Sequence, residues 1–263
     1  MLELVYSLFM EKVEIQSTKG RVAAVIHRPK VKTGRLAILC PGFLDSKDYD
    51  HLLSLANDLV DLGYTVVSFD PTGTWESEGD ISDYTVTQYL DDVKSVTEYM
   101  LSYENYEKII LCGHSIGGFV SMLYAINDSR ISVVLAIMPP HSLALIVNKD
   151  IMGKWKKEGF KTFFKDIPNS QENKKFNVPY PDIGDLKQYN VLNEVEKLQI
   201  PLILIAGELD NIIPPEDVEL IYTKANEPKQ YILLKGVHHE YRYNINEIKK
   251  INQAILASDY ILK

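Results

Sequence analysis

The chain has 263 residues, 46% of them hydrophobic, a length that suits one large α/β domain. Its net charge of −8 and isoelectric point near 5.3 argue against nucleic acid or an anionic membrane as the main partner. Two cysteines, Cys40 and Cys112, supply neither a disulfide framework nor a zinc cluster. We expect both to be buried free thiols, because each lies near the end of an apolar run.

Neither a leader nor a membrane segment is expected. The stretch before Met10 is too short and too acidic for a secretory signal, and Met10 could itself be the native start. The longest apolar stretch, residues 131–147, is interrupted by Pro139, Pro140 and His141, which argues against a membrane span. We therefore expect a cytoplasmic protein that does not associate with membranes and is a monomer or a homodimer.

Strand and helix patterns alternate along most of the chain. Polar and apolar residues alternate over 13–17 and 21–28 around a Thr-Lys-Gly turn, which predicts an N-terminal β-hairpin. Apolar runs predict further strands over residues 35–40, 65–70, 108–112, 131–138, 202–207 and 230–234. Helical spacing predicts helices over residues 51–62, 86–101, 116–126, 215–225 and 245–261. This order is typical of a mostly parallel sheet covered by helices on both faces, which binds ligands beyond its C-terminal strand ends.

Residues 113–117, Gly-His-Ser-Ile-Gly, form a G-x-S-x-G pattern between an expected strand and an expected helix. Gly113 and Gly117 remove side chains that would collide across so tight a turn. Ser115 is thereby lifted above the sheet, and the free N–H of Ile116 points toward a developing oxyanion. We therefore predict that Ser115 is a nucleophile, against the alternative of an idle serine in a Gly-rich turn.

A serine nucleophile needs a base and an orienting acid, and two later strands end in such residues. One strand is followed by Glu208 and Asp210, and we prefer Asp210 as the acid with Glu208 as the alternative. The next is followed by His238 and His239. Because adjacent side chains point in different directions, only one can reach Ser115. We prefer His239 as the base and place His238 beside the site or in solvent.

A second oxyanion donor should come from the loop after the strand at residues 35–40. Gly42 allows the backbone to approach the site closely, and we expect the N–H of Phe43 to be the donor. The alternative is an ordinary Pro-Gly turn.

Residues 139–189 interrupt the alternation and are too long for a simple connection, so we predict a lid. Trp75 and Trp155 either form an aromatic wall over Ser115 or pack the lid onto the body. We place His114, His141 and His238 among the substrate-binding residues and expect His27 and His51 at the surface. The lid lysines either attract carboxylated substrates or, as we prefer, form a solvated helix face: Lys149, Lys154, Lys156, Lys157, Lys161 and Lys165.

With these motifs, residues 12–263 resemble the α/β-hydrolase superfamily, and more narrowly the esterase-like cinnamoyl/feruloyl-esterase and serine-aminopeptidase-like group. The order Ser, Asp, His is the one that α/β hydrolases use. Pro41 stands where the group has the histidine of His-Gly-Phe, and Thr72 and Trp75 replace an arginine and a glycine of a second motif. The resemblance implies a single α/β-hydrolase domain over residues 1–263: a twisted sheet with an N-terminal hairpin and a lid, 139–189, after the sixth strand.

We expect a serine hydrolase that cleaves small carboxylic esters through an acyl-enzyme on Ser115, with Asp210 and His239 completing the triad. No cofactor and no metal site is expected, since nothing resembles a metal, phosphate or dinucleotide motif. Two other enzyme classes remain open, a serine aminopeptidase and a thioesterase. A low-turnover ligand-binding protein with the same fold is the alternative outside enzymes.

Overall fold

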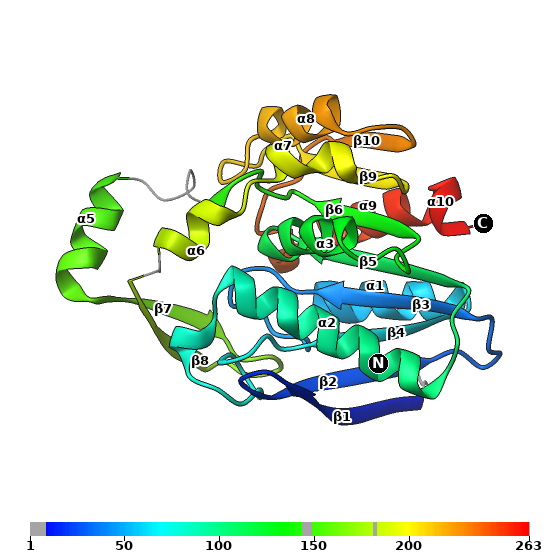
Figure 1. Cartoon of the computed structure of the whole chain (residues 1–263), viewed down its shortest axis with the longest axis horizontal. Coiled ribbons are helices and arrows are strands. Elements are labelled where there is room, and N and C mark those ends of the chain that lie inside the picture. Colours follow the sequence, from blue (N-terminus) through cyan, green and yellow to red (C-terminus); the bar gives the residue numbers. More distant parts are fainter. Residues whose placement is uncertain (1–8, 144–148, 181–182, 263) are drawn as a thin grey trace.

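The computed structural model describes residues 9–143, 149–180 and 183–262. Its centre is an eight-stranded sheet in the order β1-β2-β4-β3-β5-β6-β9-β10 (Figure 1). The strands are β1 (Phe9–Ser17), β2 (Gly20–Arg28), β3 (Arg35–Cys40), β4 (Tyr64–Phe69), β5 (Lys108–His114), β6 (Val133–Ile137), β9 (Leu202–Gly207) and β10 (Lys229–Leu234). β2 pairs antiparallel with β1 and β4, and the other neighbours are parallel. The predicted fold class, N-terminal hairpin included, is confirmed.

Helices cover both faces of this sheet. They are α1 (Asp50–Asp61), α2 (Val86–Tyr103), α3 (Ile116–Ile126), α7 (Val191–Glu194), α8 (Pro215–Lys224), α9 (Ile245–Leu256) and α10 (Asp259–Leu262). Short 3₁₀ turns are η1 (Ile81–Asp83), η2 (Val195–Lys197) and η3 (Tyr241–Tyr243). The predicted single helix over 245–261 is wrong, because the helix is interrupted between α9 and α10. Ser258 there donates its hydroxyl to Gln230 on β10. None of the helices in the described ranges is long and apolar enough to cross a membrane.

The period-two alternation of the strands divides the core into two layers. On β3, Leu36 and Ile38 join the layer under α2, α3 and α8, whereas Ala37 and Leu39 join the layer under α1 and α9. Cys40 and Cys112 are buried free thiols, as expected, in different layers. Two thick apolar layers hold the C-terminal strand ends, and therefore the loops that follow them, in one place.

The insertion, residues 139–189, contains regular structure that the sequence analysis did not predict. It comprises α5 (Lys149–Glu158), a separate two-stranded antiparallel sheet of β7 (Phe160–Asp166) and β8 (Asn173–Pro179), and α6 (Ile183–Gln188). In Figure 1 these elements lie beyond one end of the central sheet. The β7–β8 turn is closed by a hydrogen bond from Ile167 N to Glu172 O, 2.9 Å long, and by Asn169 at φ 58°. Residues 144–148 and 181–182 of the predicted lid lie outside the described residues.

Candidate active site

Ser115 stands on a strained turn between β5 and α3. Its backbone has φ 53° and ψ −120°, a region that a non-glycine residue rarely adopts. Glycine is required on both sides of it. A Cβ on Gly113 would lie 2.2 Å from the carbonyl carbon of Gly117, and one on Gly117 would lie 2.0 Å from the carbonyl oxygen of Cys40. The local sequence therefore dictates the turn that presents the serine hydroxyl beyond the strand end.

The side chains of Ser115, His239 and Asp210 meet in one hydrogen-bonded line. His239 Nε2 is 3.0 Å from Ser115 Oγ, and His239 Nδ1 is 2.7 Å from Asp210 Oδ2. The other carboxylate oxygen of Asp210 accepts the backbone N–H groups of Ile212 and Ile213, at 2.9 and 2.8 Å. This arrangement assigns Nδ1–H of His239 to Asp210 and leaves Nε2 to accept the serine proton. The three predicted triad residues are thus brought together.

The alternative residues on the same two loops point elsewhere. Glu208 Oε2 accepts the N–H of Gly236 at 2.9 Å and is exposed. His238 Nδ1 lies 3.1 Å from Glu247 Oε1, and its side chain is 58% exposed. Of the two placements expected for His238, the structure shows the exposed one, with the imidazole hydrogen-bonded to Glu247 on α9, and a role in substrate binding stays a prediction.

The two backbone N–H groups predicted to form the oxyanion hole remain available. Within the described part of the chain, neither Phe43 N nor Ile116 N has a hydrogen-bond acceptor. The loop that carries Phe43 is shaped by a turn from Asp45 N to Gly42 O, 3.1 Å long, and by Leu44 at φ 54°. Two free donors beside a serine form the arrangement that stabilises a tetrahedral oxyanion.

A cavity of about 520 Å³ opens onto Ser115 and His239. Much of its wall is aromatic or aliphatic, including Phe43, Tyr84, Ile116, Trp155, Phe163 and Tyr180. The mix of a mainly apolar wall and a few polar groups is typical of a site for a small organic molecule.

The substrate-binding residues predicted from sequence are only partly gathered around this cavity. His114 and Trp155 line it. Trp75 and His141 are not among its lining residues. Trp75 instead donates Nε1–H to Leu44 O at 2.9 Å and packs edge-on against Phe176 of β8, so it packs the insertion onto the body. Trp155 therefore forms part of the aromatic wall of the cavity, and Trp75 packs the insertion onto the body.

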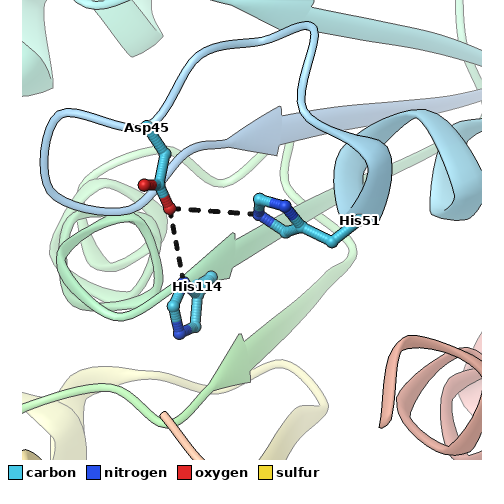
Figure 2. Close-up of side chains that lie close together, drawn as sticks. All are labelled: Asp45, His51 and His114. Atoms are coloured by element: carbon cyan, nitrogen blue, oxygen red, sulfur yellow. Dashed lines mark ion pairs between the residues drawn. The ribbon is translucent and has the colours of Figure 1, made fainter. Parts of the chain in front are cut away.

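Asp45, His51 and His114 form a buried polar cluster (Figure 2), which adjoins the candidate site because the rings of His114 and His239 lie 4.8 Å apart. Asp45 Oδ2 is 4.0 Å from His51 Nε2 and 3.8 Å from His114 Nδ1. Burial lowers the pKa of His51 to about 3 and also lowers the pKa of His114, so both rings are neutral at pH 7. The expectation that His27 and His51 lie at the surface is wrong: β2 is an internal strand, and His51 is on the inner side of α1.

The same three side chains have the spacing of potential metal ligands, and they alone do so among the described residues. A tetrahedral zinc site with bonds of about 2.1 Å keeps its ligand atoms about 3.4 Å apart, closer than the separations found here. The Asp45 carboxylate also forms ion pairs with two cations, Lys165 Nζ at 3.1 Å and Arg242 Nε at 3.7 Å. Burial would raise the pKa of Asp45, but His114 and Lys165 outweigh it and hold that pKa well below its usual range. These features favour an electrostatic role for Asp45 over a metal centre.

The preferred interpretation of the lid lysines as a solvated helix face is wrong for two of them. Lys161 and Lys165 belong to strand β7 and line the cavity. The sequence analysis did not single out Asp45 as a candidate residue, and it did not predict that Lys161 and Lys165 face the cavity. Lys161, Phe163 and Lys165 stand at every second position, which is the spacing of residues on one face of a strand, and turn residues follow them. This spacing was the available signal.

A G-x-S-x-G turn on a mostly parallel eight-stranded sheet, with histidine and aspartate on later loops, defines the α/β hydrolases. The family model for the alpha/beta hydrolase fold matches residues 37–180, more than half of the chain, and the protein belongs to this family. A curated relative is the mitochondrial palmitoyl-protein thioesterase ABHD10 of Rattus norvegicus. It is 23% identical over 238 residues, which cover 86% of this chain and 74% of the relative.

Two solved structures share the fold at low identity. Est1E from Butyrivibrio proteoclasticus with bound ferulic acid has a TM-score of 0.73 and 20% identity, covering 92% of this chain and 96% of that one. Mouse alpha/beta hydrolase domain-containing protein 10 has a TM-score of 0.72 and 20% identity, covering 93% and 96%. The protein is therefore an α/β-hydrolase-fold protein with esterase and thioesterase relatives.

Proposed function

We propose that the protein is a serine hydrolase that cleaves carboxylic esters through an acyl-enzyme on Ser115. The observation that carries the proposal is the continuous Ser115–His239–Asp210 hydrogen-bonded line at the mouth of an apolar cavity. A strained turn holds the hydroxyl, and the Asp210 carboxylate beside Nδ1 favours the tautomer of His239 whose Nε2 accepts the serine proton.

The reaction proceeds in two halves. His239 Nε2 accepts the Ser115 proton as the hydroxyl oxygen attacks the ester carbonyl carbon, and Asp210 stabilises the resulting imidazolium. The N–H groups of Phe43 and Ile116 hold the oxyanion, each contributing about 3 kcal/mol to transition-state stabilisation. His239 then protonates the departing alcohol. Water, deprotonated by His239, attacks the acyl-enzyme and releases the acid, which regenerates Ser115.

Thioester cleavage is the second candidate, because the same acyl-enzyme forms from a thioester and because ABHD10 relatives are named as thioesterases. An aminopeptidase needs an unpaired carboxylate to bind a free α-amine, and the three carboxylates that line the cavity within the described ranges are engaged. Asp45 pairs with Lys165, Asp185 accepts the N–H groups of Val86 and Thr87, and Glu240 pairs with Arg242. We further propose that the insertion is a lid, since Trp155, Lys161 and Phe163 form one wall of the cavity.

The test is hydrolysis of 4-nitrophenyl esters from acetate to decanoate, and of matching acyl thioesters, by wild type and Ser115→Ala. We expect the variant to lose activity by about 10⁴-fold or more, because the nucleophile is gone while folding is unaffected. Ser82→Ala removes another serine of the cavity wall and should retain activity within about twofold. Full activity in Ser115→Ala, or folded wild type inactive on every ester and thioester, would contradict the proposal.

A further inference from the structure

Strand β7 reverses the usual orientation of apolar and charged side chains. Its alternation places Lys161, Phe163 and Lys165 on the face that lines the cavity. Phe160 and Phe164, on the other face, are 46% and 67% exposed. Packing alone would favour the opposite orientation, with Phe160 and Phe164 inward and the two lysines outward, so the inward lysines indicate a binding role.

Two of the three inward lysines of the β7–β8 sheet already have internal partners. Lys165 Nζ pairs with Asp45 at 3.1 Å, and Lys174, paired across the sheet from Lys165, donates to the backbone carbonyl of Trp75. Their charges help to attach the insertion to the body. Neither ammonium group is therefore free to bind a substrate without breaking that attachment.

Lys161 differs from both. Its ammonium lies 4.8 Å from the ring centroid of Phe163 and 5.8 Å from that of Trp155, and both rings line the cavity. Among the described residues, no carboxylate lies within ion-pair distance of it: the register places Val178, not an acid, opposite Lys161 on β8. A cation held against aromatic faces is partly removed from water, which strengthens its attraction for an anion.

We propose that Lys161 binds a carboxylate at the far end of the substrate's acyl group, so that the preferred substrates are esters or thioesters of dicarboxylic acids. This inference rests on the proposed function of the site. The carboxylate gains a charge-assisted hydrogen bond to the ammonium, while the methylenes between it and the scissile carbonyl pack against the aromatic wall. An acyl chain of equal length that ends in a methyl group would bury the Lys161 ammonium without an anionic partner, which costs free energy.

The experiment compares the mono-4-nitrophenyl esters of adipic and suberic acid with esters of the same length that end in a neutral carboxamide. Wild type should prefer the carboxylate by about tenfold or more in kcat/KM. In Lys161→Met the carboxylate-to-carboxamide ratio of kcat/KM should fall to about one. Lys161→Arg should keep the preference, because it restores a cation.

Lys157→Met is the matched control, since Lys157 is an exposed lysine on α5 and should leave the ratio unchanged. Thermal unfolding of each variant verifies that Lys161→Met is folded. Ester turnover through Ser115 with no carboxylate preference, or with a preference that Lys161→Met retains, overturns this inference and leaves the proposed function intact. Wild type that turns over neither ester but is active on the acetate-to-decanoate series overturns this inference alone. Inactivity on every ester and thioester contradicts the proposed function, and the inference falls with it.

Discussion

The two sides of the cavity are built differently. On the body side, Ser115, His239 and Asp210 follow strands embedded in two large apolar layers. On the insertion side, the wall belongs to a small cluster whose buried members are Leu44, Trp155, Phe176 and Val178. The proposed reacting groups are therefore held by a large core, and the side chains that line the cavity from the insertion by a small one. Such a division lets binding preference change without disturbing the triad.

A charged junction connects the two sides. Arg242 Nη1 donates to Asp166 Oδ1 at the end of β7, at 2.9 Å, and Tyr49 Oη donates to the Asp166 carbonyl at 2.8 Å. Asp45 lies between Arg242 and Lys165, with His51 and His114 on its other oxygen. Because Asp45 is also in the loop that carries Phe43, this junction couples the position of the insertion to the predicted oxyanion hole.

The largest effect should come from the body side. Asp210→Asn should lower kcat by about 10⁴-fold with little change in stability, because the amide favours the wrong tautomer of His239. Glu208→Gln, the matched change two residues earlier, should stay within about twofold. Steady-state kinetics on the best ester would measure both. The reverse ranking would make Glu208 the acid and contradict the geometry of the triad.

Breaking the junction should have the next largest effect, on stability. Asp45→Asn should lower the free energy of unfolding by about 3 kcal/mol, since it leaves the cations of Lys165 and Arg242 without their shared buried carboxylate. Glu240→Gln removes a half-exposed partner of Arg242 and should cost less than about 1 kcal/mol. Urea unfolding measures each. Equal effects would mean that Asp45 does not hold the two sides together.

The smallest of these effects is a pH dependence that originates in His51. Its pKa is about 3 in the folded protein, so the unfolded chain binds more protons between that pH and its ordinary pKa. Stability from this group is present above the unfolded pKa and is lost as pH falls. The neighbouring charges are Asp45, which raises the pKa, and His114, Arg242 and Lys165, which lower it.

The free energy of unfolding of wild type relative to His51→Phe should therefore fall by about 2 kcal/mol between pH 6.5 and 4.5. The difference between the two proteins is the readout, because other buried acids titrate in the same range. A difference that is independent of pH would show that His51 keeps an ordinary pKa in the folded state.

Local patterns were sufficient for the central sheet and for the few residues that could form a triad. The strands, the Gly-His-Ser-Ile-Gly turn and the acidic residues after the strand at 202–207 each have a signal within about ten residues. Parallel strands then bring their C-terminal ends to the same edge of the sheet. The β7–β8 strands were missed because their phenylalanines and lysines do not follow the usual inward-apolar pattern. The burial of His51 was missed because it depends on which side of α1 faces the body.

The sequence by itself determined the class of protein, the strained turn at Ser115 and the candidate partners of that serine, because steric and hydrogen-bonding requirements there are local. Only the tertiary structure decided between His239 and His238, and between Asp210 and Glu208. The imidazole of His238 is hydrogen-bonded to the carboxylate of Glu247, and the carboxylate of Glu208 accepts the N–H of Gly236, so both side chains are directed away from the serine. The tertiary structure also decided that Lys161 faces the cavity with no ion-pair partner among the described residues, because that depends on how a separate sheet packs onto the body.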